Sequence, residues 1–262
     1  MKKPTQHQFR WRNIDNRWYS STRRIRDGIT LSKAFGKSTP TDVYVSTSSW
    51  LNPVELPRLN DTEAPYPILL DHLVVFDIDV PPFSQKNMEV ARKYAVKMYE
   101  WMKEKSDYAF SHVTFSGSKG FHLFYHDLQR EKFQIPDPRQ REDTVRESRK
   151  KLLEQAVTDG HHIDTRITAD TRRIIRLPGT VHGKTGWICS IISLEQLHQP
   201  FSKWKDTLLR HTQSRDMPKK ASAKKSLFPR KKKPVEVNEY LLNLQVDFLQ
   251  TLRIFPTKTL LI

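Results

Sequence analysis

Cysteine is nearly absent from this 262-residue sequence, because Cys189 is the only one. A single cysteine excludes an internal disulfide and any zinc module that one chain would build from several cysteines. The sequence also lacks a run of about 20 apolar residues, and its first residues, MKKPTQHQFRW, lack the apolar core of a signal peptide. We therefore expect an intracellular, cytoplasmic protein that does not insert into a membrane.

Acidic residues are few relative to basic ones. The sequence has 29 Asp and Glu against 45 Lys and Arg, which gives a formal net charge of +16 at pH 7. An excess of this size favours a polyanionic partner, and nucleic acid is the first candidate. Hydrophobic residues make up 37% of the sequence and aromatic residues 10%, which is enough for a folded core.

The composition changes near Ser214, and this change predicts three parts. They are a folded domain over 1–212, a basic linker over 213–234 and a helical appendage over 235–262. Apolar residues recur at helical spacing in the appendage, at Val237, Leu241, Leu244 and Phe248. A lone amphipathic helix of this kind either folds back on the main domain or docks on a partner.

Strand and helix patterns are interleaved in the predicted folded domain. Strands are predicted at 42–47, 72–80, 109–115, 121–125, 172–176 and 187–192, and helices at 88–102 and 138–159. The last two strands are expected to pair with each other around a turn. This interleaving favours an α/β (α+β) fold with mixed central β-sheets flanked by helices.

Two acids, Asp77 and Asp79, follow the apolar run LVVF. Because they are two positions apart on a strand, their carboxylates project from the same face and could share a cation. Asp-x-Asp is equally typical of an ordinary surface strand end. The apolar run favours a buried central strand whose tip opens at a cleft, where open α/β sheets bind ligands.

The segment SGSKGFH concentrates hydrogen-bond donors. Its two glycines allow the backbone to approach a ligand, and Ser116, Lys119 and His122 add a hydroxyl, an ammonium and an imidazole. Together with backbone N–H groups, these donors suit a phosphate chain. An ordinary hairpin turn with a solvated lysine has the same composition.

The densest group of charged residues lies in HIDTRITADTRRIIRLPGTVHGKTGW and includes Asp164, Arg176, His182 and Lys184. An acid followed by cations fits a metal ion with a triphosphate. The segment is not a Walker A loop, because Gly179 stands one residue too close to Gly183. The pair at 161–162, His-His, lacks a further ligand at zinc-site spacing.

Taken together and in this order, FDID, SGSKGFH, HID and IRLPGTVHGKTG resemble the motifs of one family. It is the catalytic small subunit of archaeal and eukaryotic primases, within the archaeo-eukaryotic primase superfamily. That family combines an Asp-x-Asp strand, a Ser-Gly-x-x-Gly-x-His turn and a later Asp followed by Arg-x-Pro-x-x-x-His-x-Lys-Thr-Gly. The resemblance covers residues 10–205 and implies an RRM-like primase/polymerase catalytic core.

The resemblance implies a DNA primase that makes short primers from nucleoside triphosphates on a single-stranded DNA template. It implies Asp77, Asp79 and Asp164 as catalytic acids that bind two Mg²⁺ or Mn²⁺ ions. No zinc is expected, because the cysteine-rich zinc module that is common in this family cannot be built from one cysteine. It assigns the phosphates of the incoming nucleotide to Ser116, Lys119, His122, Arg176, His182 and Lys184. It also implies a role in replication at the nucleoid, with a primase large subunit or another replication protein as the candidate partner.

The sequence leaves two other functions open. A repair or gap-filling primase-polymerase would extend an existing 3′ end instead of starting a strand. A non-catalytic nucleic-acid-binding module would keep the basic surface and lack turnover, and the intact acids argue against it.

Overall fold

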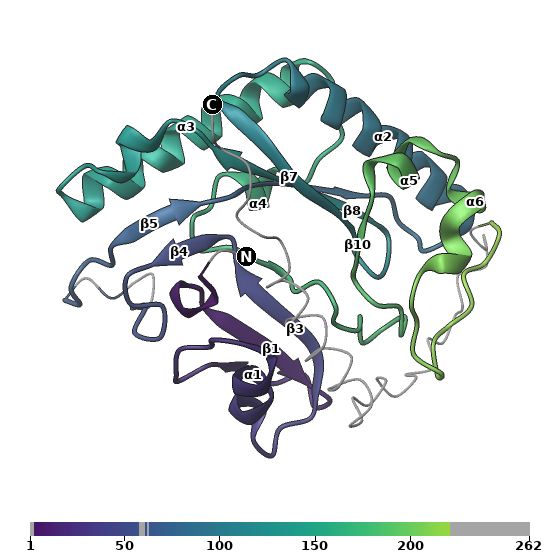
Figure 1. Cartoon of the computed structure of the whole chain (residues 1–262), viewed down its shortest axis with the longest axis horizontal. Coiled ribbons are helices and arrows are strands. Elements are labelled where there is room, and N and C mark those ends of the chain that lie inside the picture. Colours follow the sequence, from purple (N-terminus) through teal and green to yellow (C-terminus); the bar gives the residue numbers. More distant parts are fainter. Residues whose placement is uncertain (1–2, 58–60, 62, 221–262) are drawn as a thin grey trace, which may run out of the picture.

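The computed structural model describes residues 3–57, 61 and 63–220, except the side chains at 166 and 167. The predicted appendage at 235–262 and most of the basic linker lie outside the described residues. Figure 1 shows an α/β structure in which helices flank several β-sheets, as predicted. In the described part of the chain, no helix has the length and apolar character needed to cross a membrane.

Ten strands are described: β1 (Phe9–Asn13), β2 (Trp18–Ser20), β3 (Pro40–Ser46), β4 (Ser48–Trp50), β5 (Leu69–His72), β6 (Val74–Asp79), β7 (Tyr108–Phe115), β8 (Gly120–Asp127), β9 (Ile174–Arg176) and β10 (Ser190–Ile192). The described α-helices are α1 (Gly28–Phe35), α2 (Gln85–Lys103), α3 (Pro138–Thr158), α4 (Thr165–Thr168), α5 (Leu194–His198) and α6 (Phe201–Trp204). All described strand pairs are antiparallel.

The N-terminal sheet has the strand order β2-β1-β3-β9. Alternate residues of its strands face an apolar cluster, because side chains on a strand point to opposite faces in turn. This cluster includes Phe9, Trp11, Val43, Val45 and Ile175, with Leu31 and Phe35 of α1. Helix α1 begins at an Asp27 N-cap, whose carboxylate accepts a hydrogen bond of 2.8 Å from the Thr30 amide.

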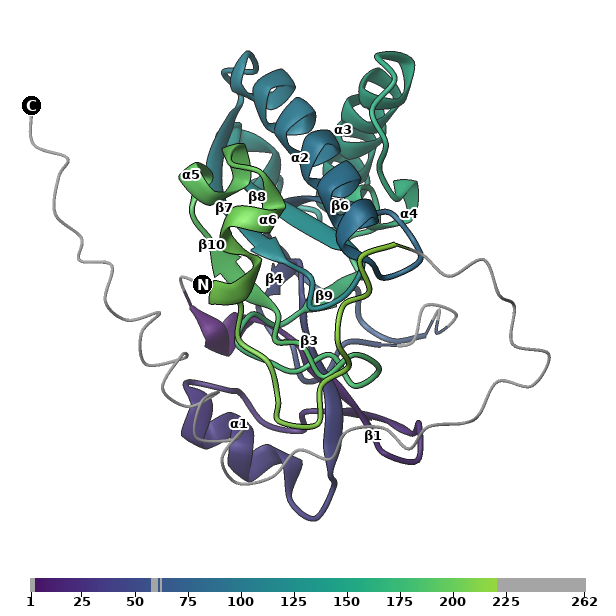
Figure 2. The same cartoon turned by 90° about the vertical axis from the view of Figure 1, so that its right-hand side faces the viewer.

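The second large sheet has the strand order β10-β7-β8-β6 and holds the main hydrophobic core. Helix α2 covers it, and Figure 2 shows α2 and α3 at the end of the molecule opposite α1. The α2 face at Met88, Ala91, Ala95, Met98 and Met102 is buried, as the helical spacing predicts. It packs against Val74, Phe76 and Ile78 of β6 in one cluster.

Two expectations about the sheets are wrong. The strands predicted at 172–176 and 187–192 do not pair with each other, because β9 pairs with β3 and β10 pairs with β7. Strand β6 is not central, since it has one strand neighbour, β8, and lies at the edge of its sheet. Strand β6 is apolar although it lies at an edge, because α2 covers one of its faces and the short helix α4 shields its free edge.

That edge is covered by the segment that contains α4. The Asp164 amide donates a hydrogen bond of 2.8 Å to the Asp77 carbonyl oxygen, and the Thr168 hydroxyl donates one of 2.8 Å to the Val75 carbonyl oxygen. An uncovered strand edge leaves backbone groups without partners, so these bonds satisfy part of the edge. They also fix the position of Asp164 beside the β6 acids.

Candidate active site

Three acids predicted from two separate motifs lie together at the covered edge of β6. Asp77 and Asp79 alternate with the buried Phe76 and Ile78, so both carboxylates lie on the face opposite α2. The backbone bond from Asp164 to Asp77 brings the third acid to the same place, 87 positions further along the chain. The structure thus brings the predicted acids together.

The electrostatics of Asp77 reflect this crowding. Burial raises the pKa of Asp77 to about 8, and the negative charges of Asp79 and Asp164 act in the same direction. Its Oδ1 atom has no hydrogen-bond partner among the described residues, and His122 Nε2 lies 3.7 Å from it. A buried carboxylate oxygen without a donor is costly unless a cation or a proton neutralises it.

The side chains do not form a closed metal cage. In residues 3–57, 61 and 63–220, no three His, Cys, Asp or Glu residues form a group that could hold a metal ion. Asp79 faces a cation of the protein instead, because its Oδ2 lies 2.8 Å from Lys119 Nζ. Lys119 was predicted to hold a phosphate, and here its ammonium neutralises one of the acids.

The serine-glycine turn, residues 116–120, connects β7 and β8 beside these acids. Ser116 Oγ accepts hydrogen bonds from the Ser118 and Gly120 amides at 3.3 and 3.2 Å, so this predicted phosphate ligand stabilises the turn itself. Gly120 has no room for a side chain, because an added Cβ would lie 1.7 Å from the Ile78 carbonyl oxygen. Lys119 is the exposed cation of the turn, with 40% of its side chain accessible.

His122 lies on β8 directly opposite Asp77 in the antiparallel register. Its side chain is buried, and its Nδ1 is 3.1 Å from the Thr114 hydroxyl. Burial lowers the pKa of His122 to about 4 against the opposing effect of Asp79. The ring is therefore neutral near pH 7 and supplies a hydrogen bond, not a charge.

The HGKTG loop, residues 182–186, is attached to the serine-glycine turn. The Thr185 hydroxyl donates a hydrogen bond of 2.6 Å to the Gly117 carbonyl oxygen. Gly117 has φ +79°, and an added Cβ would lie 3.0 Å from His182 Cβ, so the two segments pack without a gap. Lys184 is exposed on this loop.

His182 is a neutral donor in the same loop. Burial lowers its pKa to about 3, and the nearby charge of Arg176 acts in the same direction. Its Nδ1 accepts a hydrogen bond of 3.3 Å from the Lys184 amide. A neutral imidazole that accepts at Nδ1 carries its proton at Nε2, which leaves Nε2 as the donor.

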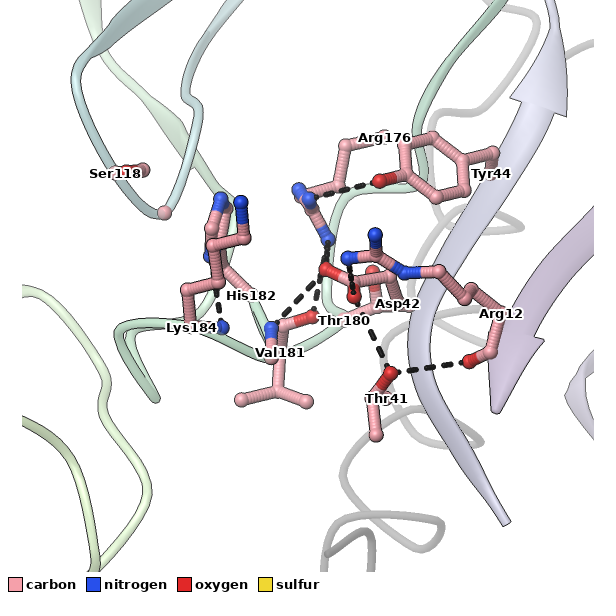
Figure 3. Close-up of polar contacts among 12 residues, drawn as sticks. Arg12, Thr41, Asp42, Tyr44, Ser118, Arg176, Thr180, Val181, His182 and Lys184 are labelled. Atoms are coloured by element: carbon pink, nitrogen blue, oxygen red, sulfur yellow. Dashed lines mark hydrogen bonds and ion pairs between the residues drawn. The ribbon is translucent and has the colours of Figure 1, made fainter. Parts of the chain in front are cut away.

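Arg176 is held by an acid that lies outside the predicted motifs. Its guanidinium donates to Asp42 Oδ1 at 2.7 Å, to the Val181 carbonyl oxygen at 3.2 Å and to the Tyr44 hydroxyl at 3.1 Å. Asp42 lies between Arg176 and Arg12, whose guanidinium donates to Asp42 Oδ2 at 2.6 Å (Figure 3).

Asp42 also anchors the HGKTG loop, because the Gly183 amide donates to its Oδ1 at 3.0 Å. One buried carboxylate therefore positions Arg176, Arg12 and the loop that carries Lys184. The sequence offers little to indicate this role, since Asp42 is there a polar position in an alternating strand. His162 is a second residue of the site that the sequence does not reveal. Its Nε2 lies 3.0 Å from the carbonyl oxygen of the acid Asp79.

These features define a site with acids on one strand edge and a cationic turn and loop beside it. No model of a known protein family matches the chain. A protein of Pyrobaculum aerophilum named DNA primase small subunit PriS is 26% identical to it over 64% of this chain and 64% of that protein. A protein of the same name from Methanococcoides burtonii is 43% identical over 18% of this chain and 12% of that protein.

The similarity confirms the resemblance to primase small subunits that the motifs predicted. The matched part of the chain spans less than two thirds of the length of either relative. The roles of the individual site residues stay predictions.

Proposed function

We propose that this protein is a template-dependent nucleotidyltransferase that synthesises primers from nucleoside triphosphates on single-stranded DNA. The observation that carries this proposal is the meeting of Asp77, Asp79 and Asp164 at one strand edge through the Asp164 to Asp77 backbone bond. The cations of the serine-glycine turn and the HGKTG loop lie beside these acids and match a triphosphate in charge. The similarity to proteins named as primase small subunits supports the same function.

The acids fit hard divalent cations such as Mg²⁺ or Mn²⁺, which bind carboxylate oxygens. Asp77 Oδ1, which has no hydrogen-bond partner in residues 3–57, 61 and 63–220, is an acceptor available to such an ion. In the proposal Asp77, Asp79 and Asp164 hold the metal ions. When bound, these ions would activate the attacking 3′-hydroxyl and stabilise the negative charge on the phosphates.

The other residues of the site bind and orient the nucleotide. Lys184 contributes an exposed ammonium, and neutral His182 and His122 contribute hydrogen bonds without adding charge. Lys119 pairs with Asp79 at 2.8 Å and would be available to the triphosphate if a bound cation neutralised that acid instead. Asp42 keeps Arg176 and the HGKTG loop in position, which reduces the rearrangement needed on binding.

A synthesis assay on unprimed template tests the proposed function. The protein is mixed with unprimed single-stranded DNA, labelled ribo- or deoxyribonucleoside triphosphates and Mg²⁺ or Mn²⁺. Short oligomers are expected. Extension of a primed template with none on unprimed template would instead support the repair or gap-filling function, and the absence of product in every combination would leave only a binding module.

Replacing Lys184 with Ala is expected to raise the KM for the nucleoside triphosphate about 10-fold to 100-fold, because a hydrogen bond to a charged group contributes about 1.5–3 kcal/mol. Steady-state kinetics on a saturating template measure this change. Lys205→Ala, which removes a cation paired with Asp206 on a different segment, serves as the matched control. A KM equal to that of wild type would show that Lys184 does not contact the nucleotide.

The basic linker is expected to add template affinity through its charge. Replacing Lys231, Lys232 and Lys233 with Ala should reduce the slope of log Kd against log salt by about 0.7 for each lysine that pairs with a template phosphate. These residues lie outside the described part of the chain. The same holds for the apolar stripe at 235–252, which is the candidate docking surface for a large subunit. Anisotropy titrations with a labelled oligonucleotide measure the slope, and an unchanged slope would exclude the linker from the template interface.

A further inference from the structure

The N-terminal sheet has a polar face opposite its apolar cluster. Cross-strand register places Ser20, Arg10, Tyr44 and Arg176 in one row and Trp18, Arg12 and Asp42 in the next. The apolar cluster takes the alternate positions, such as Val43 and Val45. The polar face therefore runs from the exposed edge strand β2 to Arg176 beside the HGKTG loop.

An exposed tryptophan stands at the outer end of this face. Trp18 is 48% exposed, whereas Trp11, Trp50, Trp187 and Trp204 are buried. Its ring lies 5.3 Å from that of Tyr44, and the guanidinium of Arg10 lies 5.3 Å from its centroid. Arg10 Nε has no hydrogen-bond partner among the described residues. An exposed aromatic ring next to arginine is the arrangement on which single-stranded nucleic acids stack their bases.

The charge around the tryptophan matches a polynucleotide. Residues 8–30 contain six arginines and two aspartates, with no lysine or glutamate. Arg17 and Arg23 are exposed on either side of β2. A mononucleotide carries its phosphates at one end, and the turn and loop of the candidate site already match them. A strand carries one phosphate per base, so it is the ligand that uses a row of cations extending away from that site.

The face is continuous with the candidate site. Tyr44 packs against Trp18 on one side, and its hydroxyl accepts a hydrogen bond from Arg176 on the other. Arg176 in turn donates to the Val181 carbonyl oxygen, next to His182. A single-stranded nucleic acid that lies on Trp18 would thus lead towards the acids.

We propose that Trp18, with Tyr44 and Arg10, forms a stacking platform for a base of the single-stranded template. The inference rests on the proposed function, which identifies the bound nucleic acid as the DNA template. It adds that the template runs over the polar face of the N-terminal sheet. Arg17 and Arg23 contact its phosphates.

Oligonucleotide binding by the full chain, without nucleotides and with a chelator present, tests the platform separately from catalysis. Trp18→Ala is expected to weaken binding of a labelled single-stranded oligonucleotide about fivefold to tenfold, and Trp18→Phe, which keeps a stacking ring, by at most about twofold. The matched control is Trp101→Ala. Trp101 lies on α2, away from the platform, and like Trp18 it has a cation against its ring, because Lys105 Nζ lies 4.0 Å from the ring centroid. The control is expected to bind within about twofold of wild type. Thermal unfolding of each variant confirms that it is folded.

Tryptophan fluorescence reports on the same contact directly. The oligonucleotide should quench the emission of the wild-type protein, and most of that quenching should disappear in Trp18→Phe. Wild-type affinity in Trp18→Ala, or quenching that persists in Trp18→Phe, would overturn the platform. A nucleoside triphosphate alone that quenches Trp18 as fully as the oligonucleotide would assign the platform to the incoming nucleotide and overturn the template assignment. Loss of synthesis on unprimed template with Trp18-dependent binding intact would overturn the proposed function alone.

Discussion

Replacing Asp77 with Asn is expected to lower the rate of primer synthesis by at least about 1,000-fold. Bound metal ions would stabilise the transition state by several kcal/mol, and the change removes one of their charged ligands. Asp164→Asn should have a similar effect, since its backbone is bonded to Asp77 and its charge acts on the same carboxylate. Both changes keep the shape of the side chain. Rates on unprimed template at saturating metal and nucleotide measure the effect.

Template affinity separates a catalytic defect from a folding defect in these variants. Binding of single-stranded DNA should stay within about twofold of wild type, because one carboxylate adds little to an interface dominated by phosphate contacts. Asp143→Asn is the matched control, since Asp143 is an exposed acid on α3 that pairs with Arg146. Asp143→Asn should synthesise normally. Activity that survives both Asp77→Asn and Asp164→Asn would show that the acids have been assigned the wrong role.

Replacing Asp42 with Asn is expected to reduce the free energy of unfolding by about 3 kcal/mol, which corresponds to a fall in Tm of about 6–12 °C. The side chain of Asp42 is 1% exposed and that of Arg176 is 8% exposed, so the change leaves a buried guanidinium without its counter-charge. It also weakens the anchor of Gly183 and should raise the KM for the nucleotide. Chemical denaturation and calorimetry measure the stability change.

The control for Asp42 is an exposed ion pair. Asp71 and Arg130 are 2.8 Å apart, with 36% and 46% of their side chains exposed. Asp71→Asn should cost at most about 1 kcal/mol, because water screens such pairs. Equal losses in the two variants would contradict the role of Asp42 as a buried anchor.

The Asp42 contribution should also depend on pH. Burial would raise the pKa of Asp42, but the charge of Arg176 and the hydrogen bond from Arg12 lower it below its ordinary value. A carboxyl whose pKa is lowered by folding stabilises the protein above its unfolded pKa, and this stability is lost as the pH falls through the folded pKa. The stability difference between wild type and Asp42→Asn should therefore be constant from neutral pH to about pH 5 and shrink below about pH 4. Urea denaturation at each pH measures it, and a difference that persists in acid would contradict the pairing.

The sequence predicted those features that depend on neighbouring residues. The spacing of Met88 to Met102 placed the buried face of α2, and the two-residue interval put Asp77 and Asp79 on one side of β6. It also located the hairpin at SGSKG between β7 and β8. These patterns are local, so one strand or helix is enough to express them.

The features that the sequence did not predict depend on distant contacts. The partners of β9 and β10 are strands far from them in the chain, and nothing in the Pro178-Gly179 turn distinguishes these pairings from a local hairpin. Asp42 meets Arg12 and Arg176 at separations of 30 and 134 residues, and no short motif contains all three. The edge position of β6 could not be predicted from its apolar sequence, because α2 and the α4 segment bury this strand as thoroughly as neighbouring strands would.

The most direct test of the account is a crystal structure of the full chain with Mn²⁺ and a nucleoside triphosphate, in which the metal is located by its anomalous scattering. We predict manganese bound by Asp77, Asp79 and Asp164, with Lys119 turned from Asp79 to the triphosphate. Manganese bound elsewhere, or a triphosphate remote from Lys184 and His182, would contradict it.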